Sequence, residues 1–152
     1  MESRQTLVEA FETKIGHRLP DDYRQFLLDG PLPYWSEDNE DDESRGNPFT
    51  DMLHSFYDLG VDEEDNWRSL DAWFDTRDPN YPEWYLEIGE QFGVGIGLSL
   101  SGPNRGRVYS WTWDTAFDPE TELAASFGQF LQDLRTQETA WNARRKEKKG
   151  PS

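Results

Sequence analysis

The sequence predicts a single α+β domain in which an antiparallel sheet packs against N-terminal and C-terminal helices. Apolar residues recur at helical spacing before residue 30 and again after residue 123. Between them, three segments alternate in character with period two and are separated by glycine-containing turns, a pattern typical of an antiparallel meander. These predicted strands are 84–88, 94–100 and 107–113. We expect Leu86, Ile88, Ile96, Leu98, Phe127 and Leu131 to be buried.

Two helices are predicted near the N-terminus, at 5–15 and 20–29. The apolar residues of the first are Leu7, Val8, Phe11 and Ile15. In the second, Pro20 suits the first turn, and Tyr23, Phe26 and Leu27 form one apolar stripe. Gly30 is expected to end this helix as a left-handed cap, with Pro31 just beyond it.

The middle of the chain contains two acidic segments. Residues 31–48 form a long connection, and its run 37–43 holds six carboxylates in seven positions, so we expect an acidic, mobile insertion over 36–48. Residues 50–59 alternate, with Leu53, Tyr57 and Leu59 on one face, which predicts a strand. A second acidic cluster, 62–65, precedes a short helical segment around Trp67, Leu70, Trp73 and Phe74.

A last helix is predicted from an apolar face made by Leu123, Phe127, Phe130, Leu131 and Leu134. Ser126 and Gln129 have the spacing of a capping box. The end of the chain after Trp141 is rich in basic residues and is expected to fray. The domain is therefore predicted to cover 1–137, followed by a basic, flexible tail over 138–152.

Composition narrows the class of protein. Only 34% of the 152 residues are hydrophobic, but seven Trp, six Tyr and nine Phe can build a core because each aromatic side chain buries a large area. The chain has no Cys, which excludes disulfides and thiolate chemistry. No apolar run has the length of a membrane span, and the polar start is unlike a signal peptide. We expect a cytoplasmic protein.

Charge indicates the kind of partner. The net charge is −16, and residues 142–152 hold five basic side chains and one acidic side chain. The rest of the chain has 10 basic and 30 acidic residues, a net charge of −20. Such a body is repelled by nucleic acid and by anionic membranes, and it attracts cationic proteins. The alternative is that the acidity serves only solubility.

Motifs for catalysis are not evident. His17 and His54 are the only histidines, and neither lies in a catalytic or metal-ligand spacing. The glycines of 93–97 resemble a phosphate loop but open a strand with no helix after it, so we interpret them as sites of close packing under a helix or against the strand 107–113. The acidic runs lack EF-hand spacing. We therefore predict no catalytic residue, no cofactor and no metal site.

Two groups of aromatic residues are candidates for recognition. Tyr109, Trp111 and Trp113 share one strand face, for which core packing is favoured over binding. Trp35 precedes the acidic run in a polar segment, where an exposed Trp can anchor a protein partner.

The N-terminal run resembles the opening signature of the SUKH superfamily. The residues that carry this resemblance are Ile15, Gly16, Leu19, Pro20, Asp22, Tyr23, Phe26 and Leu27. Downstream, Leu86-Glu87-Ile88-Gly89 with Phe92-Gly93, and the run 106–111, resemble the paired strands of the family. Ala125-Ser126-Phe127 with Phe130, Leu131 and Leu134 resembles its closing helix. One departure is Asp29-Gly30-Pro31, where the family usually shows Asn-Gly-Gly.

The resemblance implies an α+β fold and a binding role without catalysis. The superfamily contains bacterial immunity proteins, which neutralise toxins that are often nucleases, and related fungal regulators of cell-wall synthesis. Since a nuclease needs a positive surface, the acidic charge of this chain favours a cognate toxin that is basic. The residues expected to bind it are Trp35, Glu37, Asp38, Glu40, Asp41, Asp42, Glu43, Asp62, Glu63, Glu64 and Asp65. The alternative function is an acidic scaffold or regulatory module that binds other host proteins, and an enzyme comes third.

Overall fold

The computed structural model describes residues 3–33, 46–61, 67–91, 93–112 and 121–149. The helices are α1 (Arg4–Ile15), α2 (Asp21–Leu28), α3 (Pro48–Leu53), α4 (Leu70–Thr76) and α5 (Phe127–Lys149). The strands are β1 (Tyr85–Gln91), β2 (Val94–Ser99), β3 (Val108–Trp111) and β4 (Thr121–Ala124). This is one α+β domain, as the sequence predicted.

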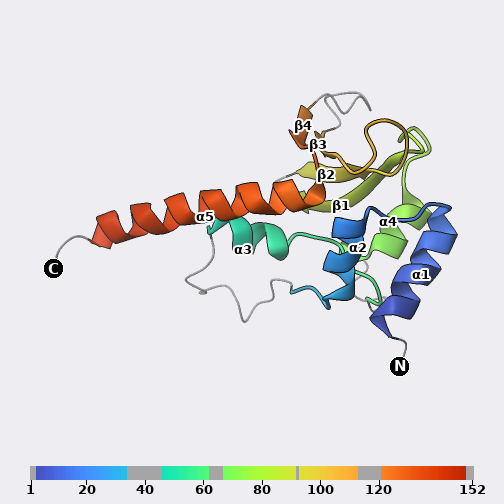
Figure 1. The fold of residues 1–152 in the computed structure, drawn as a ribbon, viewed down its shortest axis with the longest axis horizontal. Coiled ribbons are helices and arrows are strands. Elements are labelled where there is room, and N and C mark those ends of the chain that lie inside the picture. The colour runs from blue at the N-terminus through green and yellow to red at the C-terminus, as the bar shows by residue number, and fades with distance from the viewer. Residues whose placement is uncertain (1–2, 34–45, 62–66, 92, 113–120, 150–152) are drawn as a thin grey trace.

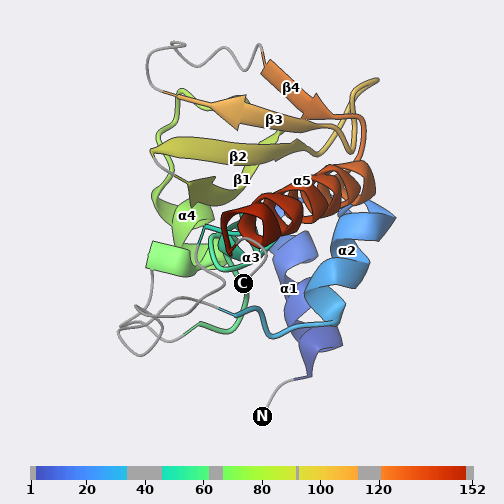
Figure 2. The ribbon, with the colours of Figure 1, turned by 90° about the vertical axis from the view of Figure 1, so that its left-hand side faces the viewer.

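The strands form one antiparallel sheet in the order β1-β2-β3-β4. Figure 2 shows α5 running across one face of this sheet, with α1, α2 and α3 on the same side. α4 lies at the β1 edge and contacts that strand. The predicted strands 84–88, 94–100 and 107–113 correspond to β1, β2 and β3, so the meander is confirmed.

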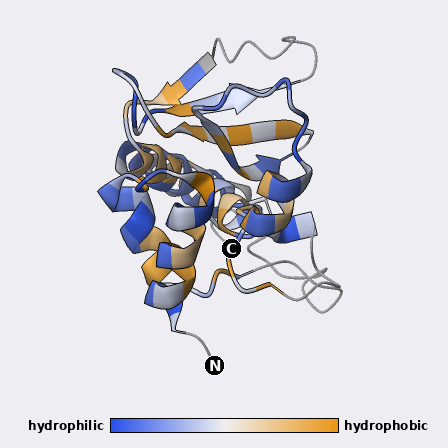
Figure 3. Cartoon of the chain, turned by 90° about the vertical axis from the view of Figure 1, so that its right-hand side faces the viewer, coloured by the Kyte–Doolittle hydropathy of each residue, from blue (hydrophilic) through white to orange (hydrophobic). Residues whose placement is uncertain are grey.

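The main core lies between this helical layer and the sheet. Leu86, Ile88, Leu98 and Phe127 are fully buried there, and Ile96 is nearly so, whereas Leu131 is half-buried and packs against the core. In Figure 3, α1 and α2 carry both hydrophobic and hydrophilic residues, as expected for helices with one buried face.

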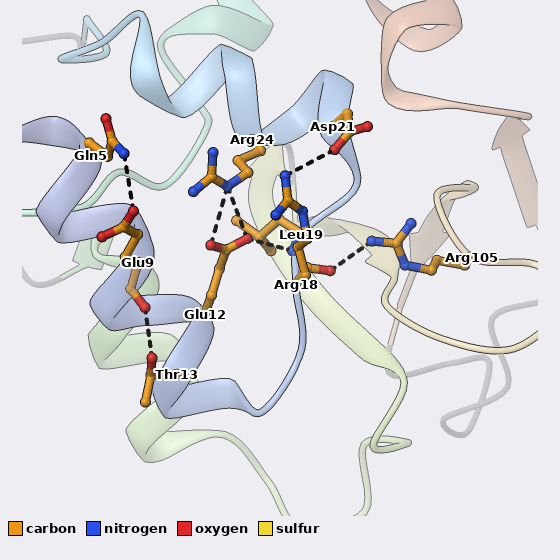
Figure 4. A network of polar contacts seen from close by, with 9 residues as sticks. All are labelled: Gln5, Glu9, Glu12, Thr13, Arg18, Leu19, Asp21, Arg24 and Arg105. Atoms are coloured by element: carbon orange, nitrogen blue, oxygen red, sulfur yellow. Dashed lines mark hydrogen bonds and ion pairs between the residues drawn. The ribbon is translucent and has the colours of Figure 1, made fainter.

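The junction between α1 and α2 is held by a polar network around Glu12 (Figure 4). The Glu12 carboxylate accepts hydrogen bonds from the backbone N–H of Leu19, at 2.8 Å, and from Arg24 Nε, at 3.2 Å. Arg105, from the turn between β2 and β3, donates to the carbonyl oxygen of Arg18 at 2.8 Å. These bonds fix the angle between the first two helices and tie their junction to the sheet.

A second contact links α2 to the start of α5. Asp22 Oδ2 accepts a hydrogen bond from the backbone N–H of Gly128, at 2.9 Å, and so satisfies a free donor of the first turn. Ser126 Oγ accepts from the N–H of Gln129, at 3.0 Å, as its predicted capping role requires. The Gln129 side chain does not complete a capping box, because it donates to Asp133.

The structure corrects the predicted end of α2. Asp29, not Gly30, is the C-cap residue, and it has right-handed backbone angles. Gly30 is absent from the glycines with positive φ and precedes a cis peptide bond to Pro31. Its missing side chain instead makes room for the Arg4 guanidinium, which a Cβ at this position would contact.

The predicted strand at 50–59 is wrong for its first half, where the chain forms α3. Asn47 caps this helix by accepting from the N–H groups of Phe49, at 3.0 Å, and Thr50, at 3.3 Å. Pro48 follows at the first helical position, which favours a helix. Only Phe56 and Asp58 make isolated β-bridges. Buried Phe49, Met52 and Phe56 are three and four residues apart, and this helical spacing competes with the alternation.

Two further differences concern the end of the chain. β4 was not predicted, because its Thr-Glu-Leu-Ala sequence gives little strand signal and, among the described strands, it pairs with β3 alone. The last helix is longer than its apolar face predicted, because α5 continues past Trp141 to Lys149. Figure 1 shows this end of α5 extending beyond the sheet and the other helices. The boundary at 137 and the flexibility of the tail remain predictions.

Candidate functional site

The partner-binding residues that the sequence predicts lie outside the described residues. Trp35 and the carboxylates of 37–43 fall in the undescribed range 34–45, and the acidic cluster 62–65 falls in the range 62–66. Trp113, the last member of the aromatic strand face, also lies outside. The candidate site described below is therefore built from other residues.

The sheet has a second, aromatic face, opposite the helical layer. Tyr85 of β1 and Tyr109 and Trp111 of β3 are buried on this face, where they alternate with the residues that join the main core. Burial of the strand aromatics was expected, and the structure confirms it for Tyr109 and Trp111. Rings from outside the sheet cover this face, since Trp73 of α4 lies 6.2 Å from Tyr85 and Tyr81 lies 5.0 Å from Trp111, between ring centroids.

Glycines in β2 allow long side chains to lie across this face. A Cβ on Gly95 would collide with the Glu87 carboxylate, and a Cβ on Gly97 would collide with the Tyr85 ring. Gly95 and Gly97 thus permit close packing, as predicted, although the side chains that they admit come from β1 rather than from the strand 107–113. Gly93 has no close neighbour, and its φ of 80° favours glycine for the turn between β1 and β2. The arrangement holds Glu87 against the sheet, next to a cavity.

This cavity, called the Glu87 cavity below, has a volume of about 350 Å³. Its aromatic lining comes from three parts of the chain and consists of Tyr57, Trp73, Tyr81 and Trp111. Its charged lining consists of Arg77, Asp78, Glu87 and Glu90. A rigid sheet therefore supplies one wall, while α4 and the segment after it supply another.

Glu87 is the buried charge of the cavity, with only 6% of its surface exposed. The Tyr57 hydroxyl donates a hydrogen bond to its Oε2 at 2.7 Å. Within the part of the chain that the structure describes, no Lys or Arg forms an ion pair with it. Burial raises the pKa of Glu87 to about 7, and the negative charge of Glu90 adds to the rise, while hydrogen bonds from Tyr57 and Trp73 oppose it.

Tyr57 reaches Glu87 because the chain after α3 runs beside β1. Phe56 makes an antiparallel bridge with Gly89, and the backbone N–H of Tyr57 donates to the carbonyl oxygen of Ile88 at 2.8 Å. A Cβ on Gly89 would lie 2.8 Å from the carbonyl oxygen of Ser55, so only glycine permits this approach. The close contact brings the Tyr57 hydroxyl within hydrogen-bond distance of Glu87.

The phenols around the cavity stay protonated at neutral pH. Burial raises the pKa of Tyr81 to about 12, and burial also raises the pKa of Tyr57 and Tyr85, in each case with a contribution from the charge of Glu87. The Arg77 guanidinium stacks 3.8 Å from the centroid of the Phe74 ring and donates to the Phe74 carbonyl oxygen. Its charge is thus held at the end of α4.

The two histidines lie away from this cavity. His17 follows the C-cap of α1 and is half-buried. His54 caps α3, and its Nδ1 lies 2.8 Å from the carbonyl oxygen of Thr50, so its predicted place in a strand is wrong. Among the described residues, no group of three or more His, Cys, Asp or Glu is arranged to hold a metal ion. The Glu87 cavity can instead hold a cation between a carboxylate and aromatic rings.

Sequence reasoning missed Glu87 and Tyr57 as partners. One signal was present, because Glu87 is a carboxylate in the middle of a strand whose neighbours Leu86 and Ile88 are apolar. Charged residues are almost never fully buried without a partner. The contact with Tyr57, 30 residues earlier in the chain, could not be read from that pattern.

Residues 4–133 match the model of the SMI1 / KNR4 family (SUKH-1). The chain belongs to this family. Proteins of the family are generally non-catalytic, and membership is consistent with an immunity-type or regulatory module that acts through protein–protein interaction. No curated protein matches the chain. None of the helices in the described ranges is both long enough and apolar enough to cross a membrane.

The structure also gives physical roles to the signature residues at the N-terminus. Gly16 ends α1 with φ of 74°, a left-handed conformation that favours glycine. Leu19, Tyr23 and Leu27 are buried in the main core. Asp22 bonds to the first turn of α5, as described above. The signature thus specifies the two-helix junction that supports the sheet, rather than the cavity.

Proposed function

We propose that this SUKH-1 protein is a non-enzymatic, cytoplasmic immunity protein that binds and neutralises a cognate bacterial toxin with a basic surface. The observation that carries the proposal is the family match over residues 4–133. The net charge of −16 supports a basic toxin, because opposite charge on the two proteins steers their encounter and raises the association rate. A nuclease-type toxin domain fits, since it needs a positive surface to hold phosphates.

The binding residues proposed from the sequence are Trp35 and the two acidic segments, 37–43 and 62–65. Charges at the rim of an interface act mainly on the association rate and are screened beyond about 8 Å at physiological salt. A Trp at the centre of an interface acts mainly on dissociation, because it is desolvated in the complex. The two kinds of residue can therefore be separated kinetically.

The first step of the test is to look for a secreted toxin gene beside the gene of this protein, and the toxin domain that it encodes is then used. Co-expression with the immunity protein should restore growth, and rapid mixing should give the two rate constants over a salt series. Replacing the six carboxylates of 37–43 by their amides should slow association strongly at low salt and much less at high salt. Trp35→Ala should speed dissociation at every salt concentration.

One outcome would contradict the immunity function, and another would contradict only the proposed interface. If the neighbouring toxin neither binds nor is neutralised, or if no toxin gene lies nearby, the alternative of an acidic regulatory module takes its place. If binding is tight but deletion of 37–43 leaves both rate constants unchanged, the immunity function stands and this segment is not part of the interface.

A further inference from the structure

We propose that the Glu87 cavity binds one cationic side chain, an arginine or a lysine, that projects from the protein partner. The carboxylate of Glu87 would accept hydrogen bonds from the cation, and the rings of Trp73, Tyr81 and Trp111 would surround it. The inference rests on the proposed function in one respect, because it takes the occupant to come from a basic protein.

The size of the cavity favours a single side chain. A volume of about 350 Å³ is near the lower end of the range for small-molecule sites, which is about 300–1,000 Å³. A folded segment of a partner cannot enter such a space, whereas one long side chain can. The glycines at 93 and 95 leave part of the wall without side chains.

The charge of the lining favours a cation. Among the described residues, three carboxyl groups, those of Asp78, Glu87 and Glu90, line the cavity together with one guanidinium, that of Arg77. Arg77 is stacked on Phe74 and donates to a backbone carbonyl group there. The cavity therefore carries an excess of negative charge, and Glu87 makes no ion pair with a described Lys or Arg.

The aromatic lining favours the same class of ligand. The ring of Tyr81 lies 5.4 Å from the ring of Trp73 and 5.0 Å from that of Trp111, between centroids, so three neighbouring rings contribute to the lining. A cation within about 6 Å of the face of Trp or Tyr is attracted by the ring quadrupole, most strongly when it is desolvated. Because Tyr81 keeps its proton, the aromatic lining remains neutral at physiological pH.

A bound cation would also change the ionisation of Glu87. Its pKa of about 7 reflects burial without a counter-charge, and a guanidinium beside it would favour the ionised form. By linkage, affinity should rise as pH increases through 7. The other titratable and charged groups around Glu87 are Tyr57, Arg77, Asp78, Tyr81, Tyr85 and Glu90.

The test is a titration of the full chain with three capped tripeptides, Gly-Arg-Gly, Gly-Lys-Gly and Gly-citrulline-Gly, followed by NMR at the indole N–H signals of Trp73 and Trp111. The Arg and Lys peptides should shift both signals saturably, with a dissociation constant on the order of 1 mM, and the neutral citrulline peptide should not. Affinity should rise about tenfold from pH 6 to pH 8, because the ionised fraction of Glu87 rises by that factor.

Three variants separate the cavity from general electrostatics. Glu87→Gln should weaken the Arg peptide at least about tenfold at pH 8 and abolish the pH dependence. Glu90→Gln removes an exposed carboxylate of the lining and should weaken binding less, which keeps the test informative if Glu87→Gln does not fold. Glu83→Gln removes an exposed carboxylate that is not part of the lining and should leave affinity unchanged.

The proposal is overturned if the citrulline peptide binds as tightly as the Arg peptide, if neither cationic peptide gives a saturable shift, or if Glu83→Gln has the same effect as Glu87→Gln. Each result would leave the immunity function untouched, because no toxin is present in this titration. Conversely, failure to neutralise the toxin with peptide binding intact would remove the proposed function and keep the cation site.

Discussion

Asp58 and Glu87 are both buried carboxylates, and the structure satisfies them in opposite ways. Asp58 is 2% exposed, and its oxygens accept from Arg4 at 2.8 Å and from the backbone N–H groups of Leu32 and Leu59 at 2.9 and 2.8 Å. These bonds join the start of α1 to the chain after α2. The backbone of Asp58 also pairs with the segment before α4, through the carbonyl oxygen of Arg68 and the N–H of Leu70.

Glu87, in contrast, has the Tyr57 hydroxyl, a contact from Trp73 and a cavity beside it. Burying a charge is costly unless it is paired and hydrogen-bonded. Asp58 avoids this cost through a cation and two backbone donors, whereas Glu87 avoids it in part by taking up a proton, as its pKa of about 7 indicates. The first arrangement is what a structural link requires, and the second leaves a carboxylate available to a ligand.

Neighbouring residues in one short segment serve both sites. Phe56 enters the main core, Tyr57 points its hydroxyl at Glu87, and Asp58 binds Arg4. Residues 56–58 therefore couple the helical layer to the aromatic face. Substitutions of Asp58 and Glu87 should therefore have different effects on stability, because Asp58 links segments of the fold and Glu87 faces the cavity.

The largest loss in the free energy of unfolding is expected for Asp58→Asn. The Asn amide has no charge to pair with Arg4. In either orientation of the amide, its NH₂ group also faces another hydrogen-bond donor, which is the Arg4 guanidinium or a backbone N–H group. Removing one partner of a buried ion pair costs about 3–5 kcal/mol. Urea unfolding followed by tryptophan fluorescence should show a loss of this size.

The control for this measurement is Asp75→Asn, which removes an ion pair with Lys14 that has the same 2.8 Å separation but is exposed. Exposed pairs contribute about 0–1 kcal/mol, so this variant should be close to the wild type. Equal, small losses in both variants would mean that Asp58 is not a structural link.

Most of the framework could be predicted from the sequence because it depends on local patterns. The apolar spacing of α1 and α2 and the alternation of β1, β2 and β3 are periodic over a few residues, and these elements were predicted. The Ser126 cap also depends on a local spacing, and it was predicted too. Where two local patterns coincided, prediction failed. In 48–56, alternation and helical spacing were both present, and the decisive signals were the Asn47 cap and Pro48.

The candidate site could not be predicted, because it depends on contacts between distant parts of the chain. Nothing near Glu87 in the sequence shows that the Tyr57 hydroxyl will reach it, and nothing near Gly89 shows that the chain at Ser55 needs the space. The residues singled out from composition, the acidic runs and Trp35, stay predictions for the toxin interface. Charge predicts only a cationic class of partner, whereas contacts between distant segments form the cavity.

The second largest effect is expected for the ionisation of Glu87, which should make the free energy of unfolding depend on pH. The pKa of Glu87 is raised from 4.5 to about 7 in the folded state, so its contribution to stability is complete below about pH 4.5 and is lost as pH rises through 7. The shift corresponds to about 3 kcal/mol. Between pH 5 and pH 8 the free energy of unfolding of the wild type should therefore fall by about 2.5 kcal/mol relative to Glu87→Gln, which is most of this amount.

This comparison with Glu87→Gln is essential, because the many other carboxylates of the chain also titrate and affect both proteins alike. Parallel pH profiles for the two proteins would show that Glu87 is ionised in the fold across the whole range. The distinction from Asp58 would then lose its basis.

The smallest effect is expected for Tyr57→Phe, and Tyr85→Phe is its matched control on the same sheet face. Tyr57 donates to Glu87, so losing its hydroxyl should cost about 1 kcal/mol at pH 5, where Glu87 is neutral, and about 2 kcal/mol at pH 8, where the acceptor is charged. The Tyr85 hydroxyl is buried and has no hydrogen-bond partner among the described residues, so its removal should leave stability unchanged or raise it. Both variants keep their rings, and unfolding at the two pH values measures the hydroxyl alone. A loss for Tyr57→Phe that does not grow with pH would show that the strength of its hydrogen bond to Glu87 does not depend on the charge of the carboxylate.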